Sequence, residues 1–205
     1  MALPDIATPT YTLTVPSTKK KVKYRPFLVK EQKVLIVALE NEDSEQILDA
    51  ITTTIQNCLI TKTKVEDLAL FDIEYLFLQI RARSIGEELE VKVTCEDDRE
   101  TTVDVKFLVN DIKVSFPKGH TNIIKLTDDI TVEMRYPDLE YFAKVNFTGG
   151  EPDPYDLMAK CIKRVYMGED DYTPDSVEES KAWVEGLTSQ QFLSLIHISE
   201  PTRRS

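Results

Sequence analysis

The two histidines are the first residues to consider for chemistry, because a Ser-His-Asp or Cys-His arrangement needs an imidazole as its base. His120 lies in a Gly-His-Thr stretch that is typical of a turn, and His197 lies in a C-terminal segment of unusual sequence. A glycosidase would need two carboxylates facing each other across a groove, and the adjacent pair Glu87-Glu88 sits beside a turn. The sequence therefore predicts no catalytic residue, and we expect the protein not to be an enzyme.

Cysteines and acidic clusters are the residues that could hold a metal ion. No Cys-x-x-Cys or His-x-x-x-His pair is present, and no acidic cluster has the EF-hand spacing of alternate oxygen ligands around a central Gly. We expect no metal and no cofactor. We interpret the acidic clusters as solvated turns; they are Asp97-Asp98, Asp128-Asp129 and Glu169-Asp170-Asp171. An odd number of widely spaced cysteines indicates reduced thiols at Cys58, Cys95 and Cys161.

Two groups of basic side chains are candidates for binding a partner. The basic run of residues 19–25 includes residues 21–24, in which Lys alternates with Val and Tyr, a pattern that is typical of a solvated edge strand that Lys protects from wrong pairing. The alternative is a strand that contacts the phosphates of a nucleic acid. The second group ends a predicted helix, where the helix dipole favours cations, and its two arginines point in different directions. The candidate partner-binding residues are Lys19, Lys21, Lys23, Arg25, Arg81 and Arg83.

Charge is distributed unevenly along the chain. The formal net charge is −11 and the sequence pI is about 4.8. Residues 1–39 carry seven Lys or Arg against two acids, a net charge of +5, which leaves −16 for residues 40–205. A strongly acidic chain is poorly suited to a phosphate backbone, so nucleic acid is not the expected partner. The opposite charges of the two ends could instead steer association with a complementary protein surface.

The sequence predicts no membrane segment. The longest uninterrupted apolar run is residues 34–39 (VLIVAL), far short of the roughly 20 residues that a membrane-spanning helix needs. The first residues lack the basic and apolar regions of a signal peptide. We therefore expect the protein to stay in the cytosol in which it is made.

Residue spacing predicts a β-hairpin and then helices in the first part of the chain. Residues 10–15 and 21–24 alternate apolar and polar side chains on either side of a turn-forming Pro-Ser-Thr. Apolar residues then recur at helical spacing from about Lys30, and again through residues 47–59. Residues 63–66 (TKVE) have the form of a capping box, which predicts that a third helix begins there, either continuous or broken near Phe71-Asp72.

Strands and then further helices are predicted in the rest of the chain. Short alternating stretches with close turns fill residues 88–136, including residues 112–116, and indicate an antiparallel meander. A helix is expected to begin at Pro137, and another to run through Leu157, Cys161 and Val165. Asp153-Pro154 is the predicted start of the helix through Leu157, and cap residues predict further helix starts at Thr173-Pro174 with residues 176–179 and at residues 188–191.

The last residues look foreign to the rest of the chain. Residues 193–203 (LSLIHISEPTR) resemble the in-frame translation of a transposase-based sequencing adapter. On that interpretation residues 193–205 are an artefact, the natural chain continues differently after about Phe192, the helix that starts at residue 188 is not completed, and His197 carries no meaning. The alternative is a genuine amphipathic C-terminal segment.

Two segments carry a family likeness: residues 24–35 (YRPFLVKEQKVL) and residues 72–87 (DIEYLFLQIRARSIGE). A sheet region and then helices follow them. In order and separation they resemble the baseplate protein family of T-even-type contractile-tailed bacteriophages, over about residues 8–192. The family includes a central hub subunit or hub-assembly factor. The resemblance implies a minor structural subunit of the hub, or a chaperone that leaves before the hub is complete. It brings no catalytic residues to transfer.

These observations lead to one prediction of organisation and one of function. We expect an α+β fold with five segments: an N-terminal hairpin arm (1–27), a helical lobe (28–87), an antiparallel β region (88–136), a C-terminal helical segment (137–192) and the adapter-like tail (193–205). We expect a tail-assembly or structural protein that binds other baseplate hub proteins or a second copy of itself, in the host cytoplasm during assembly or in the tail baseplate of the virion. One alternative is a nucleic-acid-binding regulatory protein that uses residues 19–25, and another is a small hydrolase built around His120.

Overall fold

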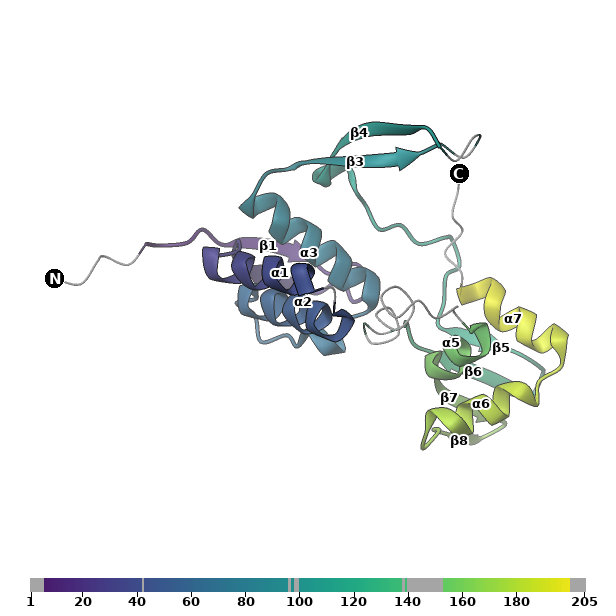
Figure 1. The fold of residues 1–205 in the computed structure, drawn as a ribbon. Helices are drawn as coiled ribbons and strands as arrows, with labels where there is room; N and C mark the ends of the chain where they lie inside the picture. The colour runs from purple at the N-terminus through teal and green to yellow at the C-terminus, as the bar shows by residue number, and fades with distance from the viewer. Residues whose placement is uncertain are drawn as a thin grey trace. The chain divides into compact units, whose positions relative to one another are not determined.

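The computed structural model describes residues 6–41, 43–95, 97, 100–137, 139 and 153–199. The chain folds into two compact units, residues 1–114 and residues 115–205, each with its own helices and strands (Figure 1). The fold is α+β, as the sequence predicts, and the N-terminal hairpin is present.

Unit 1 begins with an antiparallel hairpin of strands β1 (Tyr11–Thr14) and β2 (Lys21–Tyr24). Strand alternation gives the hairpin a buried face, which includes Val22 and Tyr24, and a solvent face. The turn holds Lys19 at a φ of 58°, a left-handed conformation that is uncommon for a residue other than glycine.

Two packed helices follow the hairpin. Helices α1 (Val29–Asn41) and α2 (Ser44–Cys58) match the predicted helical spacing. Each helix contributes one apolar stripe to their contact, and the two stripes consist of Leu35, Ala38, Ile47, Ala50 and Ile51. The rest of the apolar surface of α1 does not enter this contact.

Helix α3 (Leu70–Ser84) begins later than predicted, and the capping-box prediction for residues 63–66 is wrong. Those residues lead into a 3-10 turn, η1 (Val65–Asp67). The residue before this turn is Lys64, whose side chain makes no cap hydrogen bond, and the Val65 amide donates instead to the side-chain oxygen of Gln56 on α2, at 3.0 Å. As predicted, α3 buries a stripe that includes Ile73, Leu76 and Ile80.

A buried acid joins the hairpin to α3. Asp72, in the first turn of α3, is almost fully buried, and its carboxylate accepts hydrogen bonds from the Ser17 amide (2.9 Å) and from the Ser17 hydroxyl. A carboxylate near a helix N-terminus also interacts favourably with the helix dipole. Ser17 lies in the turn between β1 and β2, so this contact fixes the hairpin on the helical part of unit 1.

A second hairpin completes unit 1. Strands β3 (Glu88–Thr94) and β4 (Thr102–Leu108) pair antiparallel over their whole length and lead into a 3-10 turn, η2 (Val109–Asp111). Residues 112–116, which were predicted to form a strand, have no regular secondary structure.

Unit 2 is built on a four-stranded antiparallel sheet in the order β5-β6-β7-β8. The strands are β5 (Ile123–Lys125), β6 (Ile130–Met134), β7 (Ile162–Met167) and β8 (Asp170–Tyr172). The prediction of one meander over residues 88–136 is wrong, because β3 pairs with β4 while β5 and β6 form a sheet with β7 and β8. The helix predicted through Val165 also ends early, at Cys161, where β7 takes over.

The three predicted cap signals of unit 2 are confirmed. Each cap side chain accepts a hydrogen bond from a backbone amide in the first turn of its helix: Asp153 from Tyr155 (2.9 Å), Ser176 from Glu179 (3.1 Å) and Thr188 from Gln191 (3.3 Å). The helices that follow are α5 (Pro154–Cys161), α6 (Val177–Glu185) and α7 (Ser189–Ser199). The helix predicted to begin at Pro137 lies largely outside the described residues.

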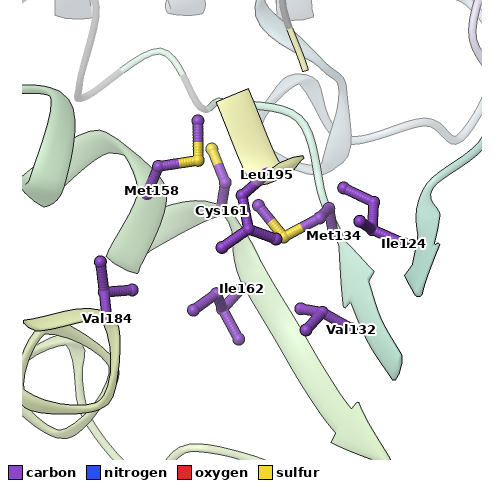
Figure 2. Close-up of a cluster of buried hydrophobic side chains, with 8 residues drawn as sticks. All are labelled: Ile124, Val132, Met134, Met158, Cys161, Ile162, Val184 and Leu195. Atoms are coloured by element: carbon purple, nitrogen blue, oxygen red, sulfur yellow. The ribbon is translucent and has the colours of Figure 1, made fainter. Parts of the chain in front are cut away.

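The sheet and the helices of unit 2 enclose an apolar core, which Figure 2 shows. The strands contribute Ile124, Val132, Met134 and Ile162, and the helices contribute Met158, Cys161, Val184 and Leu195. Leu195 belongs to α7, which runs through the start of the adapter-like tail as a continuous helix. The expectation that this helix is not completed is therefore wrong for the chain as it stands.

Candidate protein-interaction surfaces

The solvent face of the first hairpin is basic. Lys21 and Lys23 are exposed on the same side of β2, where they alternate with buried Val22 and Tyr24, and Lys19 lies in the adjacent turn. No acidic residue occurs between Ile6 and Lys30. The structure therefore brings three of the predicted partner-binding residues into one small region of unit 1.

Strand β2 is not the simple edge strand that the sequence suggested. On the side away from β1, the Lys23 carbonyl accepts a hydrogen bond from the Ile60 amide (2.8 Å), and the Arg25 amide donates to the Cys58 carbonyl (2.9 Å). Tyr24 also forms an isolated β-bridge with Leu59. The end of α2 and the residues after it thus cover this edge. The lysines are therefore not needed to protect it from wrong pairing, as the sequence had suggested.

Arg25 is engaged in a nearly buried ion pair. Its guanidinium binds the Glu31 carboxylate through two hydrogen bonds of 3.0 and 3.3 Å, with side-chain exposures of 16% for Arg25 and 3% for Glu31. Burial favours the neutral form of Glu31, but hydrogen bonds from Arg25 and from the Leu28 amide outweigh burial and lower the pKa of Glu31. The same pair raises the pKa of Arg25. Arg25 therefore acts inside unit 1, where it ties the end of β2 to α1.

Arg81 and Arg83 point in different directions from the end of α3, as their spacing predicts. Arg83 pairs with Glu87 at 2.5 Å, and its guanidinium lies 5.0 Å from the centre of the Tyr11 ring, in a cation–π arrangement. The Nη1 atom of Arg81 is buried and has no hydrogen-bond partner among the described residues. The two arginines thus form no shared patch with the lysines of β2 in the contacts of unit 1.

Helix α1 exposes apolar side chains on two flanks. Val34 and Val37 lie on one side of the buried stripe and Ile36 and Leu39 on the other, and their exposed fractions range from 46% to 61%. A helix that is apolar on most of its circumference is usually buried on most of it. From the sequence, residues 34–39 (VLIVAL) were only known to be too short for a membrane-spanning helix. The structure shows that four of these six apolar side chains are exposed.

The β3–β4 hairpin exposes an apolar face of its own. The cross-strand pairs Leu89–Phe107, Val91–Val105 and Val93–Val103 share one face, and the four valines are 38% to 49% exposed. The opposite face carries the charged pairs Glu90–Lys106 and Lys92–Asp104. This alternation is typical of a ribbon with one face to be covered. We call the six apolar side chains the valine face.

Unit 2 contains a cleft of about 670 Å³ between the sheet and α6. Its apolar lining includes Met167 and Tyr172, both about half exposed, and Trp183 of α6. The acids Asp175 and Glu179 also line it, and no Lys or Arg is among its described lining residues. Residue spacing did not indicate this cleft, because it predicted a helix where β7 lies.

His120 lies among aromatic side chains. Its Nε2 atom is 2.7 Å from the Tyr136 hydroxyl, and its ring stacks on that of Tyr136 and lies 5.3 Å from that of Phe116. Among the described residues, no group of three or more His, Cys, Asp or Glu side chains is placed to hold a metal ion. None of the helices in the described part of the chain is both long and apolar enough to cross a bilayer.

Residues 8–202 match the family model of the T4 bacteriophage base plate protein. The chain belongs to this family. Separate comparisons with curated proteins and with solved structures found no match. The match confirms the resemblance carried by residues 24–35 and 72–87, and it associates this baseplate protein with the phage tail.

The family match extends ten residues beyond the region in which the sequence likeness was recognised, from residue 192 to residue 202. It therefore overlaps the adapter-like tail of this baseplate protein. The foreign origin of residues 193–205 stays a prediction. In the structure, one residue of this tail, Leu195, is fully buried and forms part of the core of unit 2.

Proposed function

We propose that this baseplate protein is a non-catalytic component of the baseplate hub, either a minor subunit or an assembly chaperone, and that it acts by binding other hub proteins. Family membership supports the baseplate part of this proposal. The hub is proposed from the resemblance carried by residues 24–35 and 72–87, whereas the absence of catalysis and the mode of action are proposed on physical grounds. Assembly would take place in the host cytoplasm.

The observation that carries the proposal is the uncovered valine face. An isolated two-stranded hairpin is at best marginally stable in water. It usually needs a further strand, or another element packed on its apolar face, to be stable. In unit 1 the four valines of the ribbon stay more than one-third exposed, while the charged pairs occupy the other face. A protein partner that covers the valine face would remove this apolar surface from water, and both strand edges could extend a sheet of that partner.

A matched pair of double variants tests the proposal. Val91→Thr with Val105→Thr makes the valine face polar but keeps β-branched side chains, and Lys92→Thr with Asp104→Thr makes the same kind of change one register step away on the charged face. Tagged full-length protein is purified from phage-infected cells, and mass spectrometry identifies what co-purifies. We expect the wild type and the charged-face variant to retain hub proteins and the valine-face variant to lose them.

Two results would overturn the proposal. One is recovery of no hub protein with the wild type, and the other is recovery of nucleic acid alone with an affinity that falls steeply with salt, as phosphate contacts require. Presence of the protein in finished particles would identify a subunit, whereas presence only in assembly intermediates would identify a chaperone.

A further inference from the structure

The cleft of unit 2 combines an apolar floor with an acidic rim. Met167 and Tyr172 are about half exposed on its floor, and Asp175 and Glu179 lie at the N-terminal end of α6. Asp171 also lines the cleft but pairs with Arg164 at 3.1 Å. A volume of about 670 Å³ is within the usual range of sites that bind a compact group, about 300–1,000 Å³. The occupant that fits this chemistry presents aliphatic side chains next to Lys or Arg.

One flank of α1 has this chemistry. Val34 and Val37 are 48% and 46% exposed, and helical spacing places them on the same side of α1 as Lys30 and Lys33. The side chain of Lys30 is 74% exposed. Glu31, the acid between these lysines in sequence, is buried in its pair with Arg25, and Lys30 also approaches its carboxylate, to 3.8 Å. The positive charge that this flank offers to a partner is therefore mainly that of Lys33.

We propose that the Lys33–Val37 flank of α1 docks in the unit 2 cleft of a second copy of the chain, as a helix in an apolar groove. Val34 and Val37 would cover the exposed floor at Met167 and Tyr172, and Lys33, one turn before Val37, would approach the acids at the start of α6. A second copy is favoured over another protein because both halves of the complementary contact belong to this chain. Charge complementarity adds specificity and speeds encounter.

The proposed contact joins two different surfaces, so it is heterologous. A pair of copies leaves one flank of α1 and one cleft unoccupied, so further copies add head to tail into rings or short chains. The contact does not involve the valine face, so the self-association and the binding of hub proteins can be tested separately.

Sedimentation velocity on the purified full-length chain, over a range of concentrations, tests the inference. We expect the average mass of the wild type to rise with concentration, and to rise less at high salt because the rim charges are screened. Val37→Lys should weaken association about tenfold or more. The matched control is Leu39→Lys, an equivalent change on the other flank of the same helix, which should leave association unchanged.

A charge exchange identifies the partners directly. Lys33→Glu and Asp175→Lys should each weaken self-association, and an equimolar mixture of the two variants should associate as tightly as the wild type, because each swapped surface then meets its complement. Three results would overturn the inference: a wild type that stays monomeric at every concentration, equal effects of Val37→Lys and Leu39→Lys, or a mixture no tighter than the single variants. Loss of hub proteins with the valine-face variant, without a change in self-association, would leave the inference intact.

Discussion

Glu31 is the residue whose removal should affect unit 1 most directly. Replacement by Ala leaves the Arg25 guanidinium, which is only 16% exposed, without its partner and the Leu28 amide without its acceptor. Loss of one member of a buried pair costs roughly 3–5 kcal/mol, and we expect about 3 kcal/mol because Arg25 retains some contact with water. Urea denaturation measures this. Lys30→Ala is the control, since Lys30 is exposed and approaches the same carboxylate only to 3.8 Å. Equal losses for the two variants would contradict the argument.

The same carboxyl should give unit 1 an acid-sensitive stability. Burial acts against the charge, but the hydrogen bonds from Arg25 and Leu28 outweigh it, so the pKa of Glu31 is below its ordinary value of 4.5. A group with a lowered pKa in the folded state stabilises fully above its unfolded value, and this stabilisation is lost as the pH falls through the folded value. We expect the free energy of unfolding to fall as the pH drops below about 4.5, and Glu31→Gln to flatten that fall. Parallel pH profiles for the two proteins would contradict this.

The cysteines should differ in reactivity. Burial raises the pKa of the Cys58 thiol to about 11, so almost none of the reactive thiolate is present near neutral pH. Cys161 is also buried, whereas Cys95 is partly exposed. We expect iodoacetamide to modify Cys95 in the folded protein, and Cys58 and Cys161 only after unfolding, as measured by peptide mass mapping. A Cys95→Ser control should take up almost no label while folded, and rapid labelling of Cys58 would contradict the assigned burial.

Residue types and spacing could indicate which charged side chains share a face, but not which residues they bind. The basic strand was correctly recognised, and Lys21 and Lys23 do lie on one exposed face. The engagement of Arg25 could not be foreseen, because its partner Glu31 follows a turn through Pro26 and Leu28 whose geometry local spacing does not specify. The link between Ser17 and Asp72 joins residues 55 positions apart, and no local pattern predicts it.

At the scale of elements, that link should decide how firmly the first hairpin is held. Asp72→Ala removes an acceptor for both the amide and the hydroxyl of Ser17 and leaves the amide partly buried without a partner. Hydrogen bonds to a charged group contribute roughly 1.5–3 kcal/mol, so we expect a loss of about 2 kcal/mol and faster amide exchange in β1 and β2. Asp67→Ala, at an exposed acid of η1, should change stability by less than about 0.5 kcal/mol. Unchanged exchange in β1 and β2 would rule out this role for Asp72.

Elements with local signals were predicted well, and elements that depend on distant pairing were not. The helix starts at Asp153, Ser176 and Thr188 rest on contacts within four residues and were correct. Strand β7 was missed because the helix start at Asp153 favoured a continuous helix through Val165. Pairing of Ile162, Val165 and Tyr166 with β6, about 30 positions earlier, overrides that local signal.

At the scale of the whole molecule, the division into units follows from strand pairing rather than from composition. The boundary between residues 114 and 115 falls inside the stretch of alternating residues from 88 to 136. Strands on its two sides look alike in sequence, since both alternate apolar and polar residues. Their partners differ, because β4 pairs with its neighbour β3 while β6 pairs with β7, and alternation alone does not say which strands meet.

The position of Leu195 links the adapter-like tail to the stability of unit 2. Its side chain is fully buried in the core shown in Figure 2. We therefore expect Leu195→Ala to lower the free energy of unfolding of unit 2 by about 3 kcal/mol. Leu193→Ala is the matched control, because Leu193 is 49% exposed on the same helix and should change stability little. Thermal unfolding followed by the fluorescence of Trp183 reports on this unit alone, since the chain has one Trp.

The same argument predicts what a natural chain must supply if the tail is foreign. Residues that follow Phe192 in the phage genome should continue α7 and place an apolar side chain three positions after Phe192, because helical spacing directs that position at Met134 and Cys161. Clean genomic reads test this. A different sequence after residue 192 with an apolar residue at that position would support both the adapter origin and the core position. A stop codon directly after Ser205 would show that the tail is native, and a charged residue there would contradict the packing of α7.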